Sequence, residues 1–182
     1  MKWLKKRSTA ALVLVLAMVL SVLGIGGNKL QKERERIENV FYEGEAGFSV
    51  WNDIREMRET GYNLLHISEE AGGAPEAQRT AASAWSRLNE DDTPGNCAAA
   101  CKELVDAITA LDEAITFESD DLRDRWERQR NSFFEYYSHI RFDSYYDERA
   151  EEYNHLFDDP LTSLIGRITG MAEMPRFTES TT

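Results

Sequence analysis

The chain has 182 residues, and its 33 acidic and 21 basic side chains give a formal net charge of −12 at pH 7. The first 27 residues carry four positive charges and no negative ones, so residues 28–182 carry a net charge of −16. A domain this acidic repels phosphate backbones, which argues against nucleic-acid binding. It is also long enough to bury one hydrophobic core of its own.

A short basic end and a long uncharged segment begin the chain. Residues 1–7 contain four basic side chains, and residues 8–27 contain no charged side chain. Twenty residues of α-helix rise about 30 Å, which matches the hydrocarbon thickness of a bilayer. Residues 8–27 are therefore predicted to form a transmembrane signal-anchor helix. A cleavable signal peptide is the alternative, but the apolar stretch is long for one and no Ala-x-Ala cleavage site follows it.

The distribution of basic residues predicts the orientation of this helix. Cytoplasmic flanks of membrane helices are rich in Lys and Arg, whereas the stretch at 29–36 mixes basic with acidic residues. We therefore expect the basic N-terminal end in the cytoplasm and residues 28–182 outside it, in a single-pass protein of the plasma membrane. Residues 28–47 are predicted to form a juxtamembrane helical stalk with an apolar face that includes Ile37 and Phe41.

Three helices are predicted between residues 48 and 115, because apolar residues recur there at helical spacing. The first ends at the segment 71–75, where two glycines precede a proline. The second is shorter and stops at the cluster of loop-forming residues 89–95. The apolar faces comprise Phe48, Trp51, Ile54, Met57, Tyr62 and Leu65, then Ala77, Ala81, Ala84, Trp85 and Leu88, and finally Cys101, Leu104, Val105, Ile108, Leu111 and Ile115.

A longer helical pattern follows Ser119. This serine is a candidate N-cap with acidic residues in the next turn, and neither glycine nor proline occurs between Ser119 and Asp159. The spacing predicts one continuous helix, which needs a long partner because propensity alone does not hold a helix in water. The predicted fold class is therefore all-α, with one N-terminal transmembrane helix followed by an elongated antiparallel helical bundle of about four helices over residues 48–182.

The C-terminal segment carries one apolar stripe. Its only basic residues are Arg167 and Arg176, which are too few to hold an anionic membrane surface. We therefore expect the segment to pack back over the bundle, and a position at the membrane surface is the alternative. The stripe comprises Leu161, Leu164, Ile165, Ile168, Met171 and Met174.

Aromatic residues are concentrated near the end of the predicted long helix. Nine of the 19 aromatic residues of the chain lie within residues 133–157. One helix face does not hold them all, because neighbours such as Phe133 and Phe134 point about 100° apart. Either the helix is covered on two sides, or some rings are exposed and form a docking surface. The candidate partner-binding residues are Phe134, Tyr137, Tyr145 and Tyr146.

The two cysteines, Cys97 and Cys101, lie four residues apart. At this spacing on a helix the Cα atoms are about 6 Å apart, near the upper end of the distances that a disulfide tolerates. Two interpretations stay open: a helix N-terminus rich in small residues, and a disulfide at a frayed helix start in an oxidising compartment. A metal site needs two further ligands, and no Cys or His lies near enough in sequence to suggest them.

No catalytic, cofactor-binding or metal-binding residue is predicted. His139 and His155 are sixteen residues apart, too far to share a metal from one helix, and His66 is remote in sequence. Acidic pairs such as Asp120-Asp121 are typical of solvated faces and helix caps, since neighbours on a helix point in different directions. Motifs such as Gly-x-Ser-x-Gly, His-Glu-x-x-His and phosphate-binding glycine loops do not occur. We therefore expect a protein that is not an enzyme.

Two blocks of the sequence resemble the LemA family. The first is Val50 to Leu65, with a Trp, an Ile three residues later and a Tyr-Asn-Leu-Leu turn. The second begins with Glu148-Arg149-Ala150-Glu151-Glu152-Tyr153-Asn154 and continues through Asp159-Pro160, Leu164-Ile165-Gly166, Gly170 and a terminal Pro175-Arg176-Phe177. With the N-terminal apolar segment in place, the resemblance covers most of the chain. It implies a membrane-anchored helical bundle with no established enzymatic activity.

Several positions depart from the family pattern, so the chain resembles a divergent member. Asp159 stands where the family tends to have Phe before the proline, and no proline follows Leu65. The function that this resemblance leaves open has two main candidates. One is an envelope adapter, anchored by residues 8–27, that presents its helical surface to another protein. The other is a self-associating membrane scaffold without a foreign partner. A small-molecule sensor is a third, for which no residue suggests a pocket.

Overall fold

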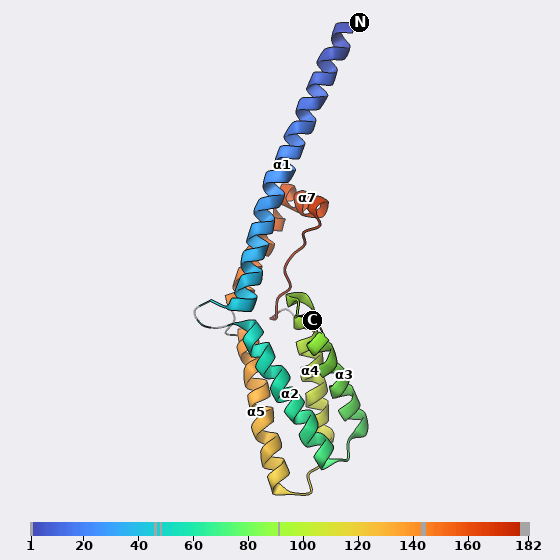
Figure 1. Cartoon of the computed structure of the whole chain (residues 1–182), viewed down its shortest axis with the longest axis vertical. Coiled ribbons are helices and arrows are strands. Elements are labelled where there is room, and N and C mark those ends of the chain that lie inside the picture. The colour runs from blue at the N-terminus through green and yellow to red at the C-terminus, as the bar shows by residue number, and fades with distance from the viewer. Residues whose placement is uncertain (1, 46, 48, 91, 143–144, 179–182) are drawn as a thin grey trace. The chain divides into compact units, whose positions relative to one another are not determined.

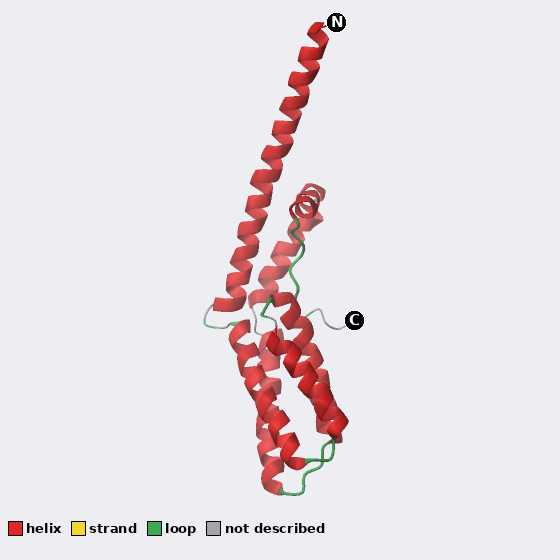
Figure 2. Ribbon diagram, turned by 45° about the vertical axis from the view of Figure 1, so that its right-hand side comes forward, coloured by secondary structure: helices red, strands yellow, loops and turns green. Residues whose placement is uncertain are grey.

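The computed structural model describes residues 2–45, 47, 49–90, 92–142 and 145–178 of the chain (Figure 1). Within these residues the secondary structure consists of α-helices and one 3-10 helix, with no strand (Figure 2). The predicted all-α class is therefore confirmed for the described part of the chain. The chain folds as two compact units, one formed by Met1–Arg36 with Glu152–Glu173 and the other by Ile37–Glu151 with Met174–Thr182.

Helix α1 (Lys2–Glu43) is a single element that covers the predicted membrane segment and most of the predicted stalk. It is long and apolar enough to cross a membrane, and hardly any of its most apolar stretch is buried. A membrane span, a signal sequence and a buried core helix share this length and composition. The low burial of the apolar stretch argues against the core helix.

The first unit adds the 3-10 helix η1 (His155–Asp158) and helix α7 (Pro160–Thr169) to the N-terminal part of α1. The Asp159 carboxylate caps α7 by accepting hydrogen bonds from the backbone N–H (2.8 Å) and the hydroxyl (2.9 Å) of Thr162. These bonds hold the pKa of Asp159 below its usual value, because they favour the charged form. The helix ends at Gly170, whose φ of 75° lies in the left-handed region that glycine adopts most easily.

The structure corrects the prediction for the C-terminal stripe. Leu161, Leu164 and Ile168 are exposed, so they do not pack over other helices. Only Ile165 and Met174 of the stripe are buried. The stripe is divided because α7 belongs to the first compact unit, whereas Met174 belongs to the second.

Four helices form most of the second unit: α2 (Val50–Ala71), α3 (Pro75–Glu90), α4 (Pro94–Ala114) and α5 (Asp120–Phe142). Helix α2 packs against α5 and against α3, and α3 packs against α4. Consecutive helices in this set run in opposite directions (Figure 1). Their ends follow local sequence signals, since Ser49 and Ser119 accept N-cap hydrogen bonds and Pro94 opens α4. Phe48, which we expected in the first of these helices, lies outside the described residues.

The core of these four helices is apolar and closely packed around Gly61 of α2. A Cβ atom added to Gly61 lies 3.4 Å from Trp85 of α3, 3.5 Å from Leu104 of α4 and 3.6 Å from Phe133 of α5. Side chains from three other helices therefore meet at one point of α2. The largest fully buried side chains of this unit include Ile54, Met57, Leu64, Leu88, Leu104, Ile108, Leu111, Trp126 and Phe133.

A cluster of five aromatic rings joins the end of α1 to the rest of the second unit. The buried ring of Phe41 lies 5.5 Å from that of Tyr146 and 6.2 Å from that of Phe177, measured between centroids. The hydroxyl of Tyr146 donates a hydrogen bond to the carbonyl oxygen of Pro175 (2.9 Å). We call Phe41, Tyr42, Trp51, Tyr146 and Phe177 the aromatic core cluster.

The predicted continuous helix between Ser119 and Asp159 is wrong. Helix α5 ends at Phe142, α6 runs from Tyr145 to Asn154, and η1 follows it. Residues 143 and 144, an Asp and a Ser, lie outside the described residues.

Both cysteines lie on helix α4 as buried thiols, with no disulfide between them. Burial in apolar surroundings raises the pKa of Cys101 far above its usual value, and the neighbouring Cys97 adds to this effect. Thiolate chemistry is therefore suppressed at Cys101 at neutral pH. Of the two interpretations of the pair, the structure agrees with the helix start rich in small residues.

Candidate functional site: an aromatic patch and a groove on the helical unit

The four candidate partner-binding residues have different environments. Tyr145 is 42% exposed, and Phe134 and Tyr137 are half-buried. Tyr146, by contrast, is only 1% exposed, because its ring packs in the aromatic core cluster. We therefore remove Tyr146 from the candidate docking residues. Its helical spacing from Tyr145 places the two rings about 100° apart, so one faces the core and the other faces solvent.

The structure adds Phe142, at the end of α5, to this region. Its ring is 71% exposed, more than any other large aromatic side chain described as exposed. The guanidinium carbon of Arg141 lies 5.1 Å from the centroid of the Phe142 ring and 5.8 Å from that of Tyr137. A cation at this distance is attracted to the ring faces and keeps the aromatic side chains ordered. We call Tyr137, Arg141 and Phe142 the α5 aromatic patch, and the exposed Tyr145 follows it in sequence at the start of α6 (Tyr145–Asn154).

The hydroxyl of Tyr137 remains a hydrogen-bond donor at neutral pH. Burial raises the pKa of Tyr137 above its usual value, and the neighbouring Arg141 offsets only part of this effect. The patch thus combines an apolar ring, a cation and a phenolic donor. This combination of Tyr, Phe and Arg is enriched in the centres of protein interfaces. The patch has the chemical character of a docking surface.

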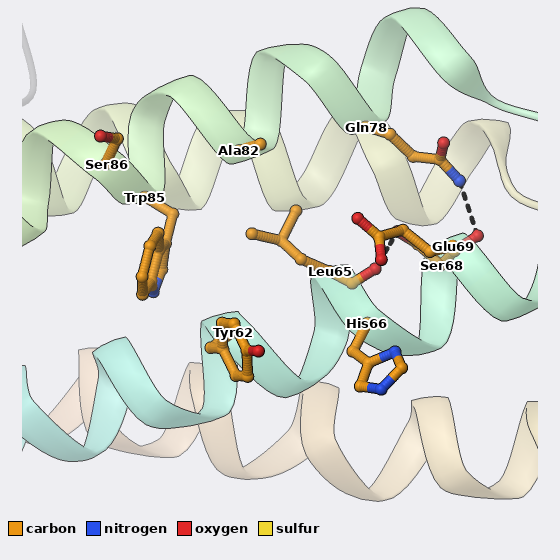
Figure 3. Close-up of a pocket in the computed structure, with 9 residues that line it drawn as sticks. All are labelled: Tyr62, Leu65, His66, Ser68, Glu69, Gln78, Ala82, Trp85 and Ser86. Carbon is orange, nitrogen blue, oxygen red and sulfur yellow. Dashed lines mark hydrogen bonds between the residues drawn. The ribbon is translucent and has the colours of Figure 1, made fainter.

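A groove between α2 and α3 forms a second candidate site, with a volume of about 360 Å³ (Figure 3). Tyr62 of α2 and Trp85 of α3 stand at one end, with ring centroids 5.6 Å apart. The indole N–H of Trp85 donates to the backbone carbonyl oxygen of Arg58 (2.8 Å), which fixes the ring. Tyr62 is exposed, so the aromatic end of the groove is open to solvent.

The other end of this groove is polar. The side-chain amide of Gln78 donates to the carbonyl oxygen of Ser68 (2.6 Å) and ties α3 to α2 (Figure 3). Glu69 lines the same end, and Leu65 with Ala82 separates it from the aromatic pair. A groove that is aromatic at one end and acidic at the other suits a short segment with an apolar and a basic side chain. This groove is not predicted from the sequence, because it exists only once α2 and α3 pack together.

The histidines and acidic pairs show no shared site. His66 lies on α2, His139 packs edge-on to Tyr136 of α5, and His155 pairs with the neighbouring Asp158 (3.0 Å). In the part of the chain that the structure describes, no group of three or more His, Cys, Asp or Glu side chains is arranged to hold a metal ion. Some of the described charged side chains form helix caps, as Asp159 does, and others form ion pairs such as Arg125 with Glu70.

Comparison with known proteins adds no relative. No protein-family model, curated protein or solved structure matches this chain. The functional argument therefore rests on the residues of the chain and on their arrangement.

Proposed function

We propose that this protein is a single-pass, membrane-anchored, non-enzymatic interaction protein of the LemA type, which acts as an envelope adapter. Residues 8–27 are the anchor, and residues 28–182 form a helical module on the extracytoplasmic side. The observation that carries the proposal is the α5 aromatic patch, because Phe142 and the following Tyr145 are exposed whereas Phe133 of α5 and Tyr146 of α6 are buried.

The anchor is supported by the exposure of α1. Large apolar side chains between Leu12 and Ile25 lie on all faces of the helix and are exposed. Exposure of so much apolar surface to water is unfavourable by about 25 cal/mol for each Å². A lipid environment removes this free-energy penalty, whereas packing within the described residues does not. The basic residues before the segment support a cytoplasmic N-terminus.

The module is suited to presenting a surface. Helices α2, α3, α4 and α5 bury a continuous apolar core, and we propose that they act as one antiparallel bundle. Such a scaffold holds side chains on its helices more rigidly than a loop does. The α5 aromatic patch lies at one end of this scaffold, because Phe142 is the last residue of α5. Aromatic side chains have few rotatable bonds and lose little conformational entropy on binding, which favours affinity from a small area.

The test is photo-crosslinking in intact cells, with the full-length protein carrying the crosslinker at Ser138 of α5. We expect one recurrent foreign protein to be captured, and we expect the double variant Phe142→Ser/Tyr145→Ser to lose that capture. The matched control is Tyr62→Ser, which removes a ring of intermediate exposure (54%, against 71% for Phe142 and 42% for Tyr145) from the α2–α3 groove. Capture should persist in this control if the α5 aromatic patch is the docking surface.

Two results would redirect the proposal. Loss of capture only in Tyr62→Ser would move the docking surface to the α2–α3 groove. Capture of copies of this chain alone, unaffected by either variant, would contradict the adapter and leave a self-associating membrane scaffold. The exposed apolar face of α1 is the feature that supports this second candidate, since helices also associate within membranes.

A further inference from the structure

Helix α7 has an apolar stripe that faces away from the protein. Leu161, Leu164 and Ile168 are 54%, 53% and 57% exposed. They are spaced three and four residues apart, so they lie on one side of the helix. Arg167 is the only charged residue within α7. The helix is thus strongly one-sided, and its apolar side is left exposed by the part of the chain that the structure describes.

The other side of α7 is held directly against α1. Ile165 lies over Gly26, where an added Cβ atom would be 2.7 Å from the Ile165 Cδ1 atom. Thr169 lies over Gly27, where the corresponding distance to Cγ2 is 2.9 Å. Side chains reach this close to a helix backbone only where glycine leaves room. The contact is therefore specific to these two positions of α1.

A second contact, at the neighbouring Gly166, also holds α7 in place. An added Cβ atom on Gly166 would be 2.5 Å from the Cε1 atom of Phe157, which follows α6 in η1. The backbone N–H of Met171 also donates to the carbonyl oxygen of Gly166 (2.8 Å). With Asp159 capping its start, α7 is a well-defined helix even though its apolar stripe is exposed.

The place of this contact along α1 suggests what covers the stripe. Gly26 and Gly27 are the last residues of the uncharged segment, and Lys29 is the first charged residue after it. On the proposed function, in which residues 8–27 cross the bilayer, this is the level where hydrocarbon gives way to headgroups. The exposed side chains of Val22 and Ile25 on α1 continue the apolar surface to this level.

We propose that α7 is an interfacial helix, and that Leu161, Leu164 and Ile168 insert into the lipid bilayer beside the transmembrane anchor. This inference rests on the proposed membrane anchor. An isolated helix with so little positive charge binds membranes weakly. Here the anchor holds α7 at the bilayer surface, so a high effective concentration replaces electrostatic attraction. Insertion should therefore need neither anionic lipid nor low salt.

The test uses full-length protein in phosphatidylcholine vesicles with a fluorescent label on one introduced cysteine. The variants are Ile168→Cys on the stripe, Arg167→Cys about 100° around α7, and Leu20→Cys in the anchor. The native cysteines are fully buried, so labelling of the folded protein is directed to the introduced thiol. Two lipids with a quenching nitroxide, placed either near the headgroup or near the methyl end of the acyl chain, report the depth of the label in the bilayer.

We expect the label at position 168 to be quenched most by the nitroxide near the headgroup, because interfacial helices bury their apolar face about 5–10 Å deep. The label at position 167 should be quenched less, and the label at position 20 should be quenched most by the nitroxide near the methyl end of the acyl chain. Quenching at 20 without quenching at 168 would overturn the interfacial helix and leave the anchor intact. Absence of quenching at 20 would overturn the anchor and the interfacial helix together. Quenching at 168 that requires anionic lipid would also contradict insertion of the apolar stripe.

Discussion

The two ends of helix α1 use apolar side chains in opposite ways. Leu12, Leu16 and Leu20 are 67%, 57% and 62% exposed, whereas Ile37 and Phe41 are 5% and 0% exposed. The first end is apolar on every side and the second is charged except for one stripe. A helix with one apolar face buries that face by packing against one neighbouring element. A helix that is apolar on every side needs apolar surroundings, such as lipid, on every side. Hydrophobicity alone therefore does not predict burial, and its distribution around the helix is the better guide.

The largest effect is expected from a substitution at the buried end of α1. Phe41→Ala removes the ring that contacts Tyr146 and Phe177 in the aromatic core cluster. We expect the free energy of unfolding to fall by about 3–5 kcal/mol, as for other buried Phe residues. Denaturant unfolding of the full-length protein in detergent, followed by tryptophan fluorescence, measures this change. The control Leu16→Ala, at the exposed end, should leave the midpoint nearly unchanged. An equal loss in both variants would contradict the comparison.

The next largest effect is expected from a substitution at the exposed end of α1. Leu16→Arg places a charge near the centre of residues 8–27, where insertion of an Arg is disfavoured by about 2.5–3.5 kcal/mol. We expect a clear fall in the fraction of the protein that stays in the membrane after alkaline extraction. Gln31→Arg adds the same charge beyond the uncharged segment and should have no effect. Equal extraction of both variants would mean that the exposed end of α1 does not reside in lipid.

A smaller effect is expected in the part of the C-terminal segment that belongs to the second compact unit. The buried Asp147 carboxylate accepts hydrogen bonds from the backbone N–H groups of Phe177 (2.9 Å) and Thr178 (2.8 Å). Asp147→Ala leaves these donors without their acceptor, and such losses amount to about 1–3 kcal/mol. Faster amide hydrogen exchange at Phe177 measures the release. Glu148→Ala, at the exposed neighbouring position, should not change this exchange, and exchange in α7 should be unaffected by either variant.

The smallest expected effect is a gain in stability. Gly61 lies inside α2, and an added Cβ atom would meet Trp85, Leu104 and Phe133 at ordinary van der Waals distances of 3.4 Å or more. Gly61→Ala should therefore stabilise the protein by about 0.5–1 kcal/mol through helix propensity. Gly27→Ala is the contrasting variant, because its Cβ atom would be 2.9 Å from Thr169 and would displace α7. Thermal unfolding of both variants measures the difference, and destabilisation by Gly61→Ala would mean that the core around it is less tolerant than its geometry indicates.

Much of the helical organisation follows from local signals in the sequence. Ser119 caps α5 and Gly72 follows the end of α2, as predicted, because capping needs only residues that are neighbours in sequence. The change from α-helix to the 3-10 helix η1 at His155 was missed, since no glycine or proline precedes it there. Among the candidate docking residues, periodicity did not separate the buried Tyr146 from the exposed Tyr145, and it did not single out the exposed Phe142.

The sequence alone determined that the chain is helical, that its first segment is apolar on all sides, and that the rest is acidic. These properties depend on composition and on spacing along one helix. Only the tertiary structure decided which side of each helix is covered. Ile165 is buried on Gly26 while Leu164 beside it is exposed, and Tyr146 enters the core while Tyr145 does not. Adjacent residues on a helix point about 100° apart, so their burial depends on which helix packs where.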